Sequence, residues 1–65
     1  MAVKMIELMG TSTNSWPDAV EEAVAKAGKS LRNIHSVDVL GLKAKVANGK
    51  ITEFRANVKI AFLIE

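Results

Sequence analysis

Few residues of this 65-residue chain are of types that do chemistry, and they are not grouped as a catalytic site requires. Cysteine is absent, which excludes a thiol nucleophile, a thiolate metal ligand and a disulfide. The single histidine, His35, has no motif around it and is expected to be a surface or capping residue. The hydroxyl side chains within residues 11–15 are expected to cap a helix. We therefore expect no enzymatic activity.

The seven acidic residues lie apart, without the spacing of an EF-hand or another metal loop. One histidine is also too few for a typical zinc site. Gly10 and Gly41 are isolated, so no glycine-rich phosphate loop is present. Symmetry in an oligomer could still bring copies of one carboxylate together.

Composition limits the class of protein. The net charge of +2 comes from 9 basic and 7 acidic residues that are interspersed, so nucleic-acid binding is not expected. No apolar run reaches the roughly 18 residues of a membrane span, and no signal-peptide pattern opens the chain, so we expect a cytoplasmic location. A single domain over residues 1–65 buries only about 60% of its unfolded surface. Without disulfides, oligomerisation is the expected support.

Residues 14–34 predict one amphipathic helix. Apolar residues recur there at intervals of three and four, which gathers them into one stripe. Asn14 or Ser15 is placed to cap the N-terminus, and Pro17 lies in the first turn, where its missing N–H is not needed. Trp16 is expected to pack in the core, with a ligand platform as the alternative.

Three other stretches predict strands. Residues 2–9 alternate in part, and residues 51–64 alternate most cleanly between apolar and polar side chains. Residues 35–46 carry a phase slip near Gly41, which indicates a β-bulge or a bend. The Asn-Gly dipeptide at 48–49 predicts a hairpin, because both residue types tolerate the positive φ of a type I′ turn.

These elements predict an α+β fold in the order β-α-β-β. The hairpin makes the last two strands antiparallel neighbours, and a helix that returns the chain lets the last strand pair with the first as well. We expect a three-stranded antiparallel sheet in the order 1-3-2, wrapped around the helix. The sheet face turned away from the helix keeps Met5, Met9, Ala61 and Leu63, and such an exposed apolar patch favours an interface.

Five segments of the chain together resemble the dodecin family. They are Glu7–Ser12, Ser15-Trp16, Ala27–Ile34, Val37–Val39 and Val58–Phe62. The resemblance extends over nearly the whole chain, and its strength lies in the combination of segments. It implies a hollow, roughly spherical homododecamer built from trimers. It also implies non-enzymatic storage of a flavin cofactor such as riboflavin or its phosphate, FMN.

The resemblance places the ligand-binding positions at Ser36, Asp38, Lys43 and Arg55. Flavin-binding dodecins have a tryptophan that stacks on the isoalloxazine ring at the position of Ser36. They have a glutamine that binds the polar ring edge at the position of Arg55, and many have a basic residue near the flavin tail or phosphate at that of Lys43. Loss of a stacking contact of about 1–3 kcal/mol weakens binding roughly ten- to hundredfold, and arginine offers no acceptor. We therefore predict weak or absent flavin binding.

Three functions remain open at this point. The first is a dodecin-like assembly whose altered pocket holds another small or anionic ligand, or a flavin weakly. The second is a structural shell, or one in which Asp38 or Glu53 meets its symmetry copies and binds a divalent cation such as calcium. The third is a small oligomeric adaptor or a weak nucleic-acid binder, which a steep salt dependence would reveal.

Overall fold

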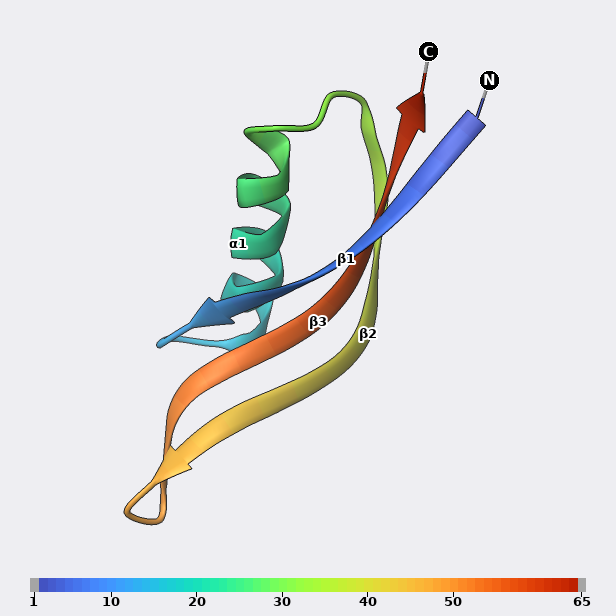
Figure 1. The fold of residues 1–65 in the computed structure, drawn as a ribbon. Coiled ribbons are helices and arrows are strands. Elements are labelled where there is room, and N and C mark those ends of the chain that lie inside the picture. The colour runs from blue at the N-terminus through green and yellow to red at the C-terminus, as the bar shows by residue number, and fades with distance from the viewer. Residues whose placement is uncertain (1, 65) are drawn as a thin grey trace.

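The computed structural model describes residues 2–64, so the two ends of the predicted domain, Met1 and Glu65, lie outside the described residues. Its elements follow the predicted order β-α-β-β and confirm the α+β class (Figure 1). They are β1 (Ala2–Ser12), α1 (Trp16–Gly28), β2 (Ile34–Ala47) and β3 (Lys50–Ile64). Within these described residues, no helix is long and apolar enough to cross a membrane.

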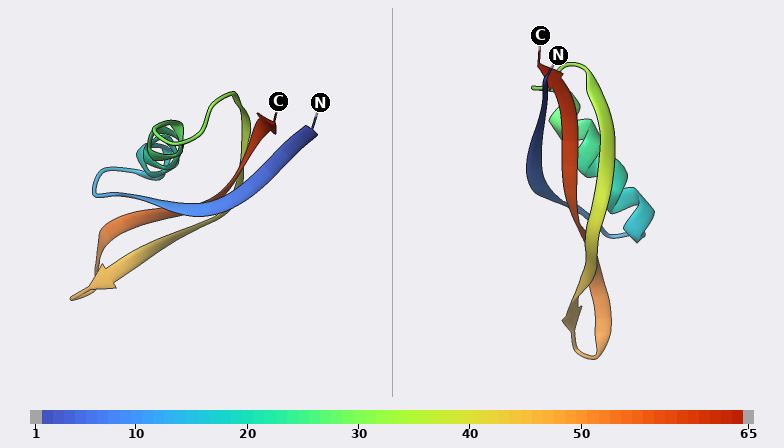
Figure 2. Two further views of the ribbon diagram at one scale, coloured as in Figure 1. Left: turned by 45° about the horizontal axis from the view of Figure 1, so that its top comes forward. Right: turned by 90° about the vertical axis from the view of Figure 1, so that its right-hand side faces the viewer.

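The three strands form one antiparallel sheet in the order β1-β3-β2, as predicted. The sheet curves around α1, which lies on one of its two faces (Figure 2). The β2–β3 hairpin continues beyond the helix, and the molecule measures 49 × 19 × 13 Å. Its radius of gyration is 13.2 Å, whereas a compact domain of this length has about 11 Å. The chain is therefore more extended than a domain that folds around its own core.

The hairpin turn and the bulge in β2 are also confirmed. Asn48 and Gly49 have φ values of 53° and 74°, the left-handed conformation that the turn requires. The pairing of β2 with β3 shifts by one residue between Val39 and Gly41. The predicted end of the first strand at residue 9 is wrong, because β1 continues through residues 10–12 and pairs with β3 there.

The helix begins as predicted but ends earlier. Ser15 is the N-cap, and its Oγ accepts a hydrogen bond from the Asp18 N–H at 3.1 Å. The predicted end at residue 34 is wrong, since α1 stops at Gly28. Asn33 has a left-handed φ of 59°, which a helix cannot include, and Ile34 already belongs to β2.

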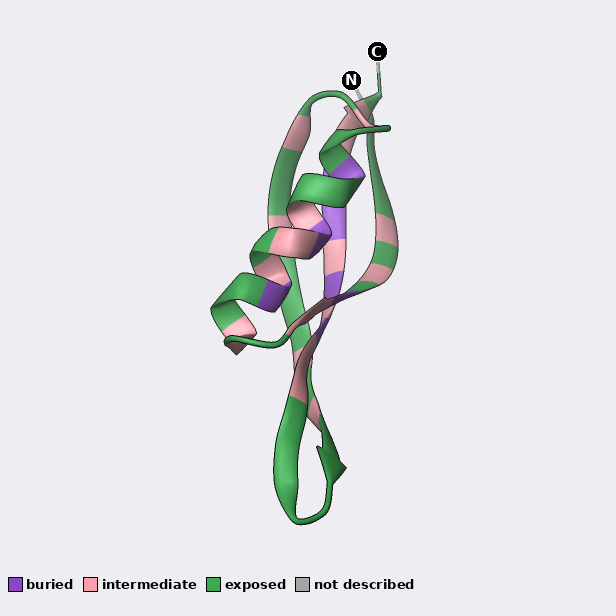
Figure 3. Ribbon diagram, turned by 90° about the vertical axis from the view of Figure 1, so that its left-hand side faces the viewer, coloured by how far each residue is buried: buried purple, intermediate pink, exposed green. Residues whose placement is uncertain are grey.

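The core lies between α1 and β3. Its helix side consists of small residues, and its sheet side of aliphatic residues on one face of β3 (Figure 3). The buried members are Ala19, Ala23, Ala27, Ala56, Val58 and Ile60. Because the helix side chains are methyl groups, the helix backbone lies close to the sheet. A Cβ atom at Gly10 of β1 would lie only 1.9 Å from the Ala19 carbonyl oxygen.

Trp16 covers the rim of this core and is only partly buried, so the prediction that it packs in the core is right only in part. Its ring meets the Phe54 ring edge-on, with 4.8 Å between centroids and 78° between planes. Its Nε1–H donates a hydrogen bond to the Lys43 carbonyl oxygen at 2.9 Å. Trp16 therefore joins the start of α1 to the hairpin.

Two substitutions separate these contacts. Trp16→Phe keeps an aromatic ring and removes the N–H donor, so we expect a loss of about 1 kcal/mol in the free energy of unfolding. Trp16→Ala also removes the ring, and we expect a loss of about 3 kcal/mol. Urea denaturation followed by circular dichroism, at equal chain concentrations, measures both. An unchanged stability of Trp16→Phe would contradict the role of the hydrogen bond, and equal losses in the two variants would contradict the role of the ring.

Candidate functional site

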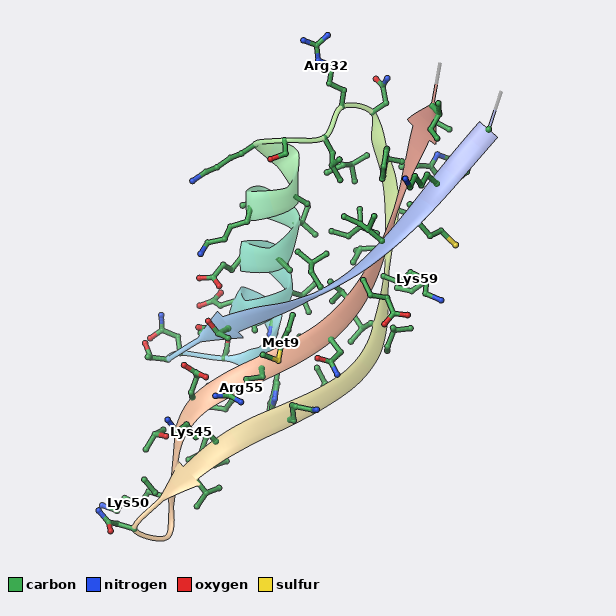
Figure 4. All side chains as sticks on the ribbon, in the orientation of Figure 1. Met9, Arg32, Lys45, Lys50, Arg55 and Lys59 are labelled. Atoms are coloured by element: carbon green, nitrogen blue, oxygen red, sulfur yellow. The ribbon has the colours of Figure 1, made fainter. Side chains whose placement is uncertain are left out.

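All four predicted binding positions lie on the sheet face turned away from α1, which we call the outer face. Even-numbered residues of β3 from 56 to 60 are buried against the helix, so the odd-numbered residues face outward. Figure 4 shows the Lys59 side chain pointing away from α1. Ser36, Asp38 and Lys43 are directly opposite odd-numbered residues of β3, so they share that face.

The structure brings Arg55 and Lys43 together. They are register partners on β3 and β2, and Thr11 of β1 pairs with Arg55 from the other side. Two cations directly opposite each other in a sheet repel, and an anion bound between them removes that repulsion. This row of the outer face can therefore bind an oxyanion.

Glu53 lies beside Arg55 on the same strand. Its Oε1 lies 2.6 Å from the Arg55 Nε, and the two side chains are 32% and 34% exposed. Arg55 is therefore held by a charge-assisted hydrogen bond, and Glu53 already has a cationic partner.

The second row of the outer face carries Lys59 between two carboxylates. Its Nζ lies 3.8 Å from Glu7 Oε1, and its register partner on β2 is Asp38. Asp38 thus also faces a cation. Among residues 2–64, no three histidine or carboxylate side chains are placed to hold a metal ion.

The structure does not bring Ser36 and Arg55 together within one chain. Ser36 pairs with Ala61, which is six residues along β3 from Arg55. Six residues of strand span about 20 Å. The candidate metal ligands Asp38 and Glu53 are separated in the same way, because Asp38 pairs with Lys59. A pocket that uses either pair must take residues from two copies of the chain.

A shallow depression of about 410 Å³ lies where β1 turns into α1. Residues 11–14 and the carboxylates of Asp18, Glu22 and Glu53 line it. Glu22 Oε1 accepts hydrogen bonds from the N–H and the hydroxyl of Thr11, at 3.1 and 3.3 Å. All of the lining residues are polar. The depression therefore lacks the apolar walls that would bind a flat apolar ring.

Sequence reasoning missed two residues of the outer face, Thr11 and Lys59. The signal for Lys59 was available, since it alternates with buried residues of β3 in the same phase as Arg55. The Thr11 hydroxyl was expected to cap the helix, and only the extension of β1 places Thr11 beside Arg55.

The structure is a small β-α-β-β domain whose single helix covers one sheet face and whose outer face carries two rows of charged side chains. The Dodecin family model matches residues 2–65, so the chain belongs to the dodecin family, whose members are small flavin-binding or storage-type proteins.

The matched relatives support this assignment. A dodecin from Thermus thermophilus is 27% identical over 62 residues, which are 95% of this chain and 90% of that protein. The structure of a dodecin from Streptomyces coelicolor superposes with a TM-score of 0.95 at 25% identity, over 98% of this chain and 91% of that one. The calcium dodecin of Mycobacterium tuberculosis, described as a calcium-chelating antigen with a novel calcium-binding site, is 32% identical. The match covers 100% of this chain and 93% of that chain, and the structures superpose with a TM-score of 0.88.

Proposed function

We propose that this dodecin is a non-enzymatic, homo-oligomeric binding or storage protein for a small ligand that carries an anionic group. The pairing of Lys43 with Arg55 on the outer face carries this proposal. The residue at position 36 is an exposed serine, which cannot stack on a flavin ring. Flavins are therefore expected to bind weakly or not at all, although flavin binding is the property that the family implies.

Two properties of the single chain support self-association. Its accessible surface is 4585 Å², against about 4,000 Å² for a compact monomer of this mass. Large apolar side chains are about half exposed on both the outer face and the hairpin; they are Val3, Met5, Met9, Leu40, Leu42, Val46 and Ile51. Contacts with other copies of this chain would bury these apolar side chains. The hollow dodecamer of trimers, the cytoplasmic location and the absence of nucleic-acid and membrane partners stay predictions.

Calcium binding is the second candidate, and the calcium dodecin relative favours it. Asp38 is the better candidate ligand, since Glu53 is bound to Arg55 at 2.6 Å. Asp38 would have to meet its own copies around a symmetry axis, because the other candidate lies about 20 Å away along the sheet of the same chain.

Equilibrium dialysis of the assembled protein against riboflavin and FMN tests the proposal. We expect less than half saturation with riboflavin at about 10 µM, because the stacking contact of about 1–3 kcal/mol is missing. FMN should bind more tightly than riboflavin, since only FMN has a phosphate for Lys43 and Arg55. Sub-micromolar binding of riboflavin would contradict the altered pocket. The same dialysis with calcium or with a chelator tests the second candidate, calcium binding. Calcium binding requires that the protein retain calcium and that the chelator weaken the assembly.

A further inference from the structure

Glu53 is the carboxylate in contact with the cationic row of the outer face. It binds Arg55 through Nε alone, at 2.6 Å. Within residues 2–64, the two terminal nitrogens of the guanidinium, Nη1 and Nη2, have no protein partner. The guanidinium is planar, so a contact at Nε fixes the direction in which the terminal edge points.

The surroundings of Arg55 restrict it further. Thr11 and Lys43 flank it across the two neighbouring strands, and its side chain is 34% exposed. Glu53 and Arg55 lie two residues apart on one strand, so their side chains leave the sheet on the same face. The cation is therefore held before any ligand arrives, with the edge that forms bidentate bonds left open.

We propose that Glu53 is a positioning residue that presents the Nη edge of Arg55 to a carboxylate or phosphate group of the ligand. This inference rests on the proposed function, because it concerns the same site. It also assigns Glu53 a role that excludes metal binding by the same oxygen. Lys43 adds a second positive charge on the neighbouring strand, and this charge favours the anion without fixing its orientation.

Positioning of Arg55 by Glu53 has a consequence that charge repulsion between Glu53 and the anion does not have. Glu53 is negative, so removing its charge alone should strengthen the binding of any anion nearby. Glu53→Gln and Glu53→Ala both remove the charge, but only glutamine keeps an oxygen that can accept from the Arg55 Nε. The ratio of their affinities therefore isolates positioning from repulsion.

Isothermal titration calorimetry of the assembled parent and variants with phenyl phosphate and with benzoate measures the affinities. Size-exclusion chromatography confirms that each variant is assembled. We expect Glu53→Ala to bind the preferred probe about tenfold more weakly than Glu53→Gln, because an unheld arginine must be ordered on binding. The preferred probe identifies the anionic group as a phosphate or a carboxylate. Glu7→Ala is the matched control, since Glu7 is an outer-face carboxylate that contacts Lys59 instead, and we expect the affinity of the parent.

Two variants separate the failure of this inference from the failure of the proposed function. Arg55→Ala should lose binding of both probes, because it removes the bidentate donor. If Arg55→Ala binds no probe while Glu53→Ala and Glu53→Gln bind equally, the site stands and the positioning role is overturned. If Arg55→Ala binds as the parent does, or the parent binds neither probe, the anion site itself is overturned.

Discussion

Replacing Gly10 by alanine is expected to lower the free energy of unfolding by about 3 kcal/mol, or to prevent assembly altogether. A Cβ atom at this position would lie 1.9 Å from the Ala19 carbonyl oxygen and 2.9 Å from the Ala23 Cβ. The first contact is with helix backbone, so no side-chain rotation relieves it. The helix and β1 would have to separate, which opens the core along its length.

Gly28→Ala is the matched control for this prediction. Gly28 is the last residue of α1, and a Cβ added there meets nothing within 4 Å. Alanine is the better helix former, so we expect stability unchanged or raised by up to about 1 kcal/mol. Urea denaturation of both variants at one chain concentration measures the difference. A Gly10→Ala protein within 1 kcal/mol of the parent would show that the helix does not lie this close to β1.

The double variant Ser36→Trp, Arg55→Gln is expected to bind riboflavin about ten- to hundredfold more tightly than the parent. The tryptophan restores a stacking surface of about 1–3 kcal/mol, and the glutamine supplies the acceptor that arginine lacks. Ser36 is exposed, so the larger side chain has room on the outer face. Quenching of flavin fluorescence on titration measures the affinity.

This gain depends on assembly, because the two positions are about 20 Å apart in one chain. We therefore expect the gain only in the assembled protein. His35→Trp with Arg55→Gln adds the same indole one residue away and should leave the affinity near that of the parent. An intact assembly of the double variant without a gain would refute the assignment of Ser36 and Arg55 to the flavin position.

Local signals in the sequence predicted most of the fold. Alternation in residues 51–64 predicts β3 and its two faces, and the Asn-Gly dipeptide predicts the turn that the structure contains. The order β1-β3-β2 follows from these elements and the direction of the helix. These features are predictable because each depends on residues close together in the chain.

The end of the helix was misjudged because the apolar period continues past it. Leu31 and Ile34 follow the helical spacing and do pack against the core, but they reach it from the connection and from β2. Gly28 and Asn33 were the signals that indicated a stop, since both residue types favour helix ends and left-handed φ values. Apolar spacing alone does not distinguish a longer helix from a connection packed against the same core.

The pairing of Arg55 with Lys43 could not be predicted from the sequence. At the turn, Ala47 pairs with Lys50 and Val46 with Ile51, a register that would place Leu42 opposite Arg55. A one-residue shift between Lys45 and Val46 moves Lys43 to that place. Thr52, the residue skipped in the pairing, bonds to the Lys45 carbonyl oxygen at 3.3 Å. No local sequence pattern predicts this register shift, although the candidate anion site depends on it.

Alternate residues of β3 have different tasks, because its even-numbered side chains from 56 to 60 are buried under α1 and its odd-numbered ones face outward. Selection can therefore act on the two sets separately. If the proposed anion site is right, exchanges at Arg55, Asn57 or Lys59 should change what the protein binds. They leave the contacts of the core in place, so they are expected to change stability by less than about 1 kcal/mol. A lineage with this fold can acquire a new ligand in a few substitutions while its folding remains as it was.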